Sequence, residues 1–155
     1  MRGCIVRTIQ VLLICIAIAV FCTRPADAST FRLLVDKSDR TMRVLNAGVE
    51  IAHYQVVIGR NPVGHKRHEG DMRTPEGTYR LTKRLCTHCT YKRAFVLDYP
   101  NAQDRTQGRT GGGILIHNGV GRFYWWTAGC IALSNADFDK LWALLPTGVY
   151  VEVRP

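Results

Sequence analysis

Short apolar segments separated by polar turns recur along most of the chain and predict a protein built mainly from β-strands. Valine, isoleucine, leucine and aromatic residues gather in these segments, whereas charged residues, glycine and proline fill the intervals. The first three runs are joined by short turns, which favours an antiparallel meander. The expected strands are residues 31–35, 42–45, 49–58, 78–82, 94–98, 114–116 and 149–153.

One helix is predicted, near the C-terminal end. Ser134 or Asn135 can cap it, and Pro146 ends it. Its apolar residues recur at helical spacing, at Phe138, Leu141, Trp142 and Leu145. Residues 60–76 and 99–113 are expected to be long polar loops. The fold class is therefore a mainly β sandwich or barrel-like domain with one short helix.

The N-terminus reads as a secretory signal peptide covering residues 1–28. Arg2 and Arg7 precede the apolar residues 8–21, and Ala26-Asp27-Ala28 is a small-x-small cleavage site. An uncleaved membrane anchor is the alternative, although the apolar run is short for a bilayer span. We therefore expect an exported protein of the periplasm or cell envelope, with one domain at residues 29–155 and no membrane span after cleavage.

Export changes how the cysteines are counted, because disulfides persist in oxidising compartments. Removal of the signal leaves Cys86, Cys89 and Cys130. Cys86 and Cys89 are expected to form a disulfide, with an open thiol pair as the alternative, and Cys130 then remains as the free thiol. An unpaired cysteine in an exported protein is more easily explained by reactivity than by packing.

The formal net charge of +9 favours an anionic partner. Nucleic acid is not expected, since the basic residues are dispersed and no nucleic-acid-binding motif occurs. A carboxylate-rich wall peptide or an anionic envelope surface suits an exported protein better, and a solvated surface without a partner is the alternative. No metal site is predicted, because the cluster His65, His68, Glu69 and Asp71 lacks a second set of ligands at suitable spacing.

His117 and Cys130 flank a glycine-rich and aromatic loop that is long enough to bring the two side chains together. An imidazole is the usual means of producing a nucleophilic thiolate near neutral pH. Gly129 could leave backbone N–H groups directed at an oxyanion, Asn118 could orient the imidazole through its carbonyl, and Thr127 could add a hydroxyl contact. The alternative is a buried histidine with an inert thiol.

The segment around these residues resembles the signature of the L,D-transpeptidase catalytic domain family (YkuD-type). In that signature an Ile-His-Gly segment precedes a loop and then [ST]-x-G-C-I-x-[LMV]-[ST]-N. Here Thr127, Gly129, Cys130 and Asn135 match, whereas three positions depart from the commonest form: Asn118, Ala128 and Ala132. The Trp-Thr-Ala-Gly-Cys-Ile-Ala form resembles a branch of the family.

The resemblance implies the family's β-rich fold, with Cys130 as the nucleophile and His117 as the general base. It also implies peptidoglycan stem peptides as substrates, acyl transfer through a thioester in cell-wall remodelling, and no cofactor. A hydrolase of wall-linked peptides and a non-catalytic envelope-binding module are the alternatives. The aromatic residues 123–126 could line the mouth of the cleft or anchor the core, and the oligomeric state is left open.

Overall fold

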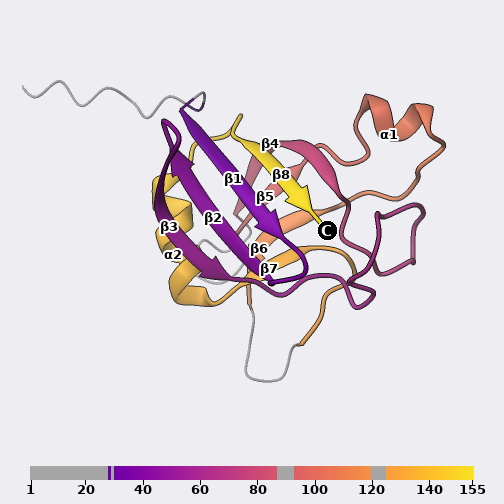
Figure 1. Cartoon of the computed structure of the whole chain (residues 1–155), viewed down its shortest axis with the longest axis horizontal. Coiled ribbons are helices and arrows are strands. Elements are labelled where there is room, and N and C mark those ends of the chain that lie inside the picture. The colour runs from indigo at the N-terminus through magenta and orange to yellow at the C-terminus, as the bar shows by residue number, and fades with distance from the viewer. Residues whose placement is uncertain (1–27, 29, 87–92, 120–124) are drawn as a thin grey trace, which may run out of the picture.

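The computed structural model describes residue 28 and residues 30–86, 93–119 and 125–155 (Figure 1). The described chain folds into eight strands and two helices. Their bounds, in chain order, are β1 Phe31–Asp36, β2 Thr41–Asn46, β3 Val49–Gln55, β4 Gly77–Cys86, β5 Arg93–Leu97, α1 Ala102–Thr106, β6 Leu115–Asn118, β7 Ile131–Leu133, α2 Asn135–Leu144 and β8 Tyr150–Arg154.

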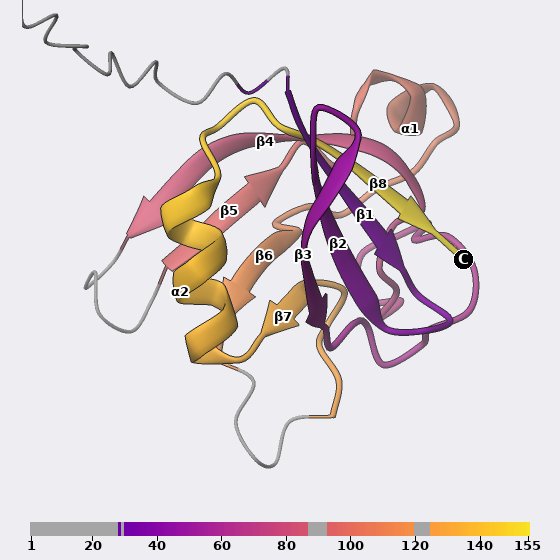
Figure 2. The same cartoon turned by 60° about the vertical axis from the view of Figure 1, so that its left-hand side comes forward.

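The strands form one strongly curved sheet in the order β3-β2-β1-β8-β4-β5-β6-β7 (Figure 2). The predicted meander is confirmed, since β1, β2 and β3 pair antiparallel. Two parallel pairs, β1 with β8 and β6 with β7, complete the sheet. Isolated bridges from Val57 to Ala132 and from Gly59 to Thr127 connect the chain after β3 to the β7 edge. The sheet is therefore nearly closed, as the predicted mainly β, barrel-like class requires.

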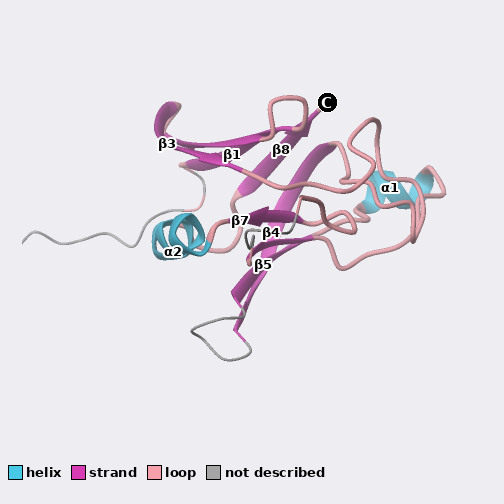
Figure 3. Ribbon diagram, turned by 90° about the horizontal axis from the view of Figure 1, so that it is seen from below, coloured by secondary structure: helices cyan, strands magenta, loops and turns pink. Residues whose placement is uncertain are grey.

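Strand β4 belongs to both layers of the curved sheet. Its first residues pair with β8, and its later residues, from Leu81 on, pair with β5, with a register shift between Leu81 and Lys83. A shift of this kind increases the local twist and bends the strand. Figure 3 shows the result, with β1, β3 and β8 in one layer and β4, β5 and β7 in the other.

The core lies between these layers, and α2 covers one end of it (Figure 3). Phe138 and Leu141 of α2 are fully buried. The ring of Phe95 on β5 lies 5.8 Å from that of Phe138 and 5.0 Å from that of Trp142. Ser134 caps the helix by accepting a hydrogen bond from the Asp137 N–H. The helix predicted from its apolar spacing is thus confirmed, and its packing holds the segment just after Cys130.

Two elements were not predicted. Residues 131–133 form β7, which is buried at every position and therefore shows no alternation of polar and apolar residues. Helix α1 lies within the predicted loop 99–113, where Asn101 and Asp104 form a capping box. The predicted signal peptide falls almost entirely outside the described residues and stays a prediction. Within the described part of the chain, no helix is long and apolar enough to cross a membrane.

Candidate active site

Strand pairing brings His117 and Cys130 to the same face of the sheet. In the parallel pair of β6 and β7, His117 is aligned with Ala132, and Cys130 lies two residues before Ala132. Side chains two residues apart on an extended chain point to the same side. His117, Cys130 and Ala132 accordingly line one pocket of about 380 Å³. The structure therefore brings together the two residues that the sequence selects as base and nucleophile.

The pocket has small, mostly apolar walls and an aromatic rim. The described residues that line it are Val57, His117, Gly119, Trp126, Thr127, Ala128, Cys130 and Ala132. Trp126 is 48% exposed and the neighbouring Trp125 is 75% exposed, so neither indole anchors the core. Of the four aromatic residues predicted at this loop, Phe123 and Tyr124 lie outside the described residues. For Trp126, the interpretation as a residue at the mouth of the cleft agrees with its position.

The imidazole of His117 is oriented by a backbone carbonyl. Its Nδ1 lies 2.7 Å from the backbone oxygen of Asn118. Since a carbonyl oxygen only accepts hydrogen bonds, Nδ1 carries the proton and the Nε2 lone pair of the neutral ring is left to accept one. Asn118 therefore contacts the imidazole of His117 through its main chain, and its largely buried side chain does not contribute to this contact.

The thiol of Cys130 lies in surroundings that favour its protonated form. Burial raises the pKa of Cys130, while the backbone N–H of Leu115 and the positive charge of Lys66 oppose this effect without overcoming it. Within the described residues, the thiol donates a hydrogen bond to the carbonyl of Gly113, at 3.6 Å, rather than to His117. A reactive thiolate therefore requires that the thiol proton be redirected to a base.

Thr127 ties the loop that precedes the thiol. Its hydroxyl accepts a hydrogen bond from the Gly129 N–H, at 3.1 Å, and donates one to the backbone carbonyl of Cys130, at 2.6 Å. The Gly129 N–H predicted to face an oxyanion is thus already engaged in this structure. The backbone N–H of Cys130, by contrast, takes part in none of the loop hydrogen bonds among the described residues.

Gly129 has a steric role that only glycine can fill. Its φ angle is +129°, in the region that favours glycine, and a Cβ atom there would lie 2.6 Å from the carbonyl oxygen of Arg73. Arg73 belongs to the polar loop 60–76, which therefore packs directly against the loop carrying Cys130. A larger residue at position 129 would push these two loops apart.

The loop 60–76 is organised around the buried carboxylate of Asp71. It accepts hydrogen bonds from Lys66 Nζ at 2.7 Å and from the backbone N–H groups of Arg67, His68 and Arg73. Burial alone would raise the pKa of Asp71, but these hydrogen bonds outweigh it and hold the pKa well below its usual range. Lys66 in turn is the cation whose charge acts on the thiol of Cys130.

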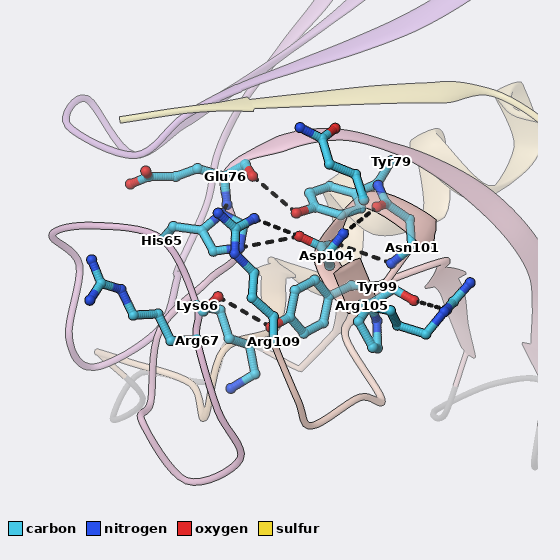
Figure 4. Close-up of polar contacts among 12 residues, drawn as sticks. His65, Lys66, Arg67, Glu76, Tyr79, Tyr99, Asn101, Asp104, Arg105 and Arg109 are labelled. Carbon is cyan, nitrogen blue, oxygen red and sulfur yellow. Dashed lines mark hydrogen bonds and ion pairs between the residues drawn. The ribbon is translucent and has the colours of Figure 1, made fainter. Parts of the chain in front are cut away.

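A second polar cluster joins this loop to α1 (Figure 4). His65 Nδ1 accepts a hydrogen bond from the Glu76 N–H, so the neutral ring carries its proton on Nε2, which lies 3.4 Å from Asp104. Arg109 donates to the same carboxylate at 2.7 Å. Burial and the charge of Arg109 lower the pKa of His65. The cluster therefore fixes a neutral histidine between the two long loops.

Asp104, Arg109 and Lys66 were missed at the level of sequence, because no local pattern distinguishes them from other charged loop residues. His65 and His68, considered above as metal ligands, lie in different hydrogen-bonding environments: His68 Nδ1 contacts the carbonyl of Glu69. Among the described residues, no group of three or more histidine, cysteine or acidic side chains could hold a metal ion.

The two cysteines outside the pocket are only partly described. Cys86, at the end of β4, is disulfide-bonded. Its predicted partner, Cys89, lies outside the described residues, so the pairing stays a prediction. Cys130 is a free cysteine.

Comparison with known proteins adds relatives of the same fold. Residues 30–153 match the family model of the L,D-transpeptidase catalytic domain, YkuD. A curated relative is the "Putative L,D-transpeptidase YafK" of Escherichia coli K12, 29% identical over 103 residues that make up 66% of this chain and 39% of the relative. The chain thus spans well under half of that protein.

Solved structures agree with this match. The helical cell shape determining protein Pgp2 of Campylobacter jejuni is 32% identical, with a TM-score of 0.70 over 81% of this chain and 47% of the other. Bd1075 of Bdellovibrio bacteriovorus is 26% identical, with a TM-score of 0.65 over 81% and 48%. An L,D-transpeptidase of Mycobacterium smegmatis, 14% identical with a TM-score of 0.57 over 81% and 59%, shares the fold. The chain therefore belongs to the L,D-transpeptidase catalytic domain family.

Proposed function

We propose that this chain is an exported cysteine acyltransferase that acts on peptidoglycan stem peptides. One observation carries the proposal: His117, with its Nε2 lone pair free, and the free thiol of Cys130 line the same pocket. Membership of the L,D-transpeptidase family supports the substrate class. Because the chain spans less than half of YafK and Pgp2, the activity and partners of those whole proteins are not transferred with it.

The proposed reaction begins when the thiol of Cys130 turns from the Gly113 carbonyl to His117. Nε2 takes the thiol proton, and the thiolate attacks the carbonyl carbon of the L-centre that precedes the terminal D-amino acid. The new C–S bond places a negative charge on the carbonyl oxygen, and the Cys130 N–H is the candidate donor to it. The C–N bond then breaks, His117 returns its proton to the leaving amine, and a thioester remains.

The second half of the reaction runs in the opposite direction. An acceptor amine gives a proton to His117 as it attacks the thioester carbonyl, so that a C–N bond forms and the C–S bond breaks. Water in place of the amine gives a shortened peptide, which is the hydrolase alternative. The exposed indole of Trp126 at the pocket mouth favours transfer, since a bulky apolar group there would limit the access of water to the thioester.

Wall fragments bearing tetrapeptide stems provide the test. We expect intact-protein mass spectrometry to show an acyl adduct on the wild-type chain and none on the Cys130→Ala variant. We also expect new L,D cross-links among the products. Products that are only shortened, despite abundant acceptor amine, would establish the hydrolase. Absence of any adduct with every wall fragment would instead favour the non-catalytic envelope-binding module.

A further inference from the structure

Among the described residues, the walls of the pocket around Cys130 provide no fixed positive charge. Apart from His117, the described lining side chains are uncharged, and two of them, Val57 and Ala132, are small and apolar. Such walls suit a small apolar side chain, but they offer no cation to the carboxylate that ends a stem peptide. Within the part of the chain that the structure describes, a cation for that carboxylate is found at the rim instead.

Among the described residues, Arg60 places a cation at this rim. Its guanidinium carbon lies 5.3 Å from the centre of the Trp126 ring, and Trp126 lines the pocket. The backbone beside it is fixed, because the Arg60 N–H donates to the Thr127 carbonyl at 2.9 Å and the Thr127 N–H donates to Ile58 at 2.8 Å. The arginine is thus anchored to the same loop that carries the nucleophile.

The charge of Arg60 is also available to a ligand. Its side chain is exposed, and it makes no ion pair with any acidic group of the described residues. Lys66, the cation whose charge acts on Cys130, is buried and bound to Asp71. Stacking on an indole leaves the edge of a guanidinium free, and its paired N–H groups match the two oxygens of a carboxylate.

We infer that Arg60, held against Trp126, binds the free terminal carboxylate of the donor peptide and so selects donors with an open C-terminus. The inference rests on the proposed function and deepens it, since it names the residue that determines which peptide end is accepted. Arg60 acts here as a specificity-determining residue. Its contact is with the leaving D-amino acid and involves no proton transfer.

Two donor peptides that differ only in a terminal carboxylate or carboxamide provide the first test. The readout is the rate of acyl-enzyme formation on Cys130, measured by intact mass. We expect the wild-type chain to prefer the carboxylate by roughly tenfold, the size of one charge-assisted contact. Arg60→Gln should lose that preference through slower reaction of the carboxylate donor alone, and Arg60→Lys should keep part of it.

Arg80→Gln is the matched control, because Arg80 also lies 5.3 Å from an aromatic ring, that of Tyr150, which does not line the pocket. It should keep the wild-type preference. Thermal unfolding of each variant checks that the fold is intact. An Arg60→Gln variant that still prefers the carboxylate as strongly as the wild type would overturn the inference.

A second probe, which needs no turnover, distinguishes failure of the proposed function from failure of the inference about Arg60. Iodoacetate and iodoacetamide alkylate the same thiol and differ in charge. If no peptide acylates Cys130, the iodoacetate-to-iodoacetamide rate ratio decides the inference. A several-fold lower ratio in Arg60→Gln than in the wild type and Arg80→Gln would support an anion-binding group beside the thiol. An equal ratio in all three would overturn it.

Discussion

The hydroxyl of Thr127 donates a hydrogen bond of 2.6 Å to the backbone carbonyl of Cys130. Because the same oxygen accepts the Gly129 N–H, one side chain closes the turn that presents the thiol. The hydroxyl group of Thr127, from which the sequence predicts a contact, is bound in this structure to the loop itself. Thr127 is accordingly a positioning residue for Cys130.

Replacement of Thr127 by valine should therefore impair acylation more than stability. Valine keeps the shape but leaves a part-buried N–H and a carbonyl without their partner, at a cost of about 1 kcal/mol in the free energy of unfolding. Thr127→Ser keeps the hydroxyl and should restore both properties. Urea unfolding and the rate of acyl-enzyme formation measure the two effects. A Thr127→Val variant that acylates as fast as Thr127→Ser would contradict the assignment.

Alkylation by iodoacetamide should reveal the pairing of Cys130 with His117. Because burial raises the pKa of the thiol, we expect the reaction of the wild-type chain to accelerate as pH rises above neutral. His117→Ala should react at least about tenfold more slowly at neutral pH, since its proton acceptor is absent. His53→Ala, a change at an exposed histidine of β3, is the control. Equal rates for His117→Ala and the wild type would show that the proposed pair is wrong.

Asp71→Asn should destabilise the chain strongly at neutral pH. The change leaves the buried ammonium group of Lys66 without its carboxylate, which costs about 3 kcal/mol in the free energy of unfolding. Asp39→Asn, at an exposed turn residue, serves as the control and should change little. Urea unfolding measures both variants.

The pH dependence of this effect has a defined sign. The pKa of Asp71 is lower in the folded chain than in the unfolded chain, so its stabilising contribution is present above the unfolded value of about 3.9 and is lost as pH falls further. The difference in the free energy of unfolding between wild type and Asp71→Asn should therefore shrink as pH falls below that value. If this difference were constant from pH 7 to pH 3, the charged pair would be excluded as its cause.

Cys86 and Cys89 are predicted to be disulfide-bonded to each other in the exported protein. Cys86 is already disulfide-bonded in the structure, and Cys130 is free. Alkylation without reductant, followed by peptide mapping, should modify Cys130 alone, whereas prior reduction should expose all three thiols. Three alkylated cysteines in unreduced protein from the envelope would refute the pairing.

The sequence by itself determined most strands, the C-terminal helix and the pair His117 and Cys130. Strands with one buried face and one exposed face alternate visibly, as in β1, and a helix with one apolar face shows its own period, as in α2. Cys130 could be selected as the candidate nucleophile because the features that mark it are local: an unpaired thiol, a glycine before it and a histidine a short loop away.

Only the tertiary structure decided what surrounds that pair. Strand β7 is buried on both faces, so its three apolar residues carry no period, and its parallel pairing with β6 depends on contacts distant in sequence. The close approach of Gly129 to the Arg73 carbonyl and that of Arg60 to Trp126 are equally non-local. Each depends on how the loop 60–76 packs against the residues just before Cys130, which short-range propensity does not encode.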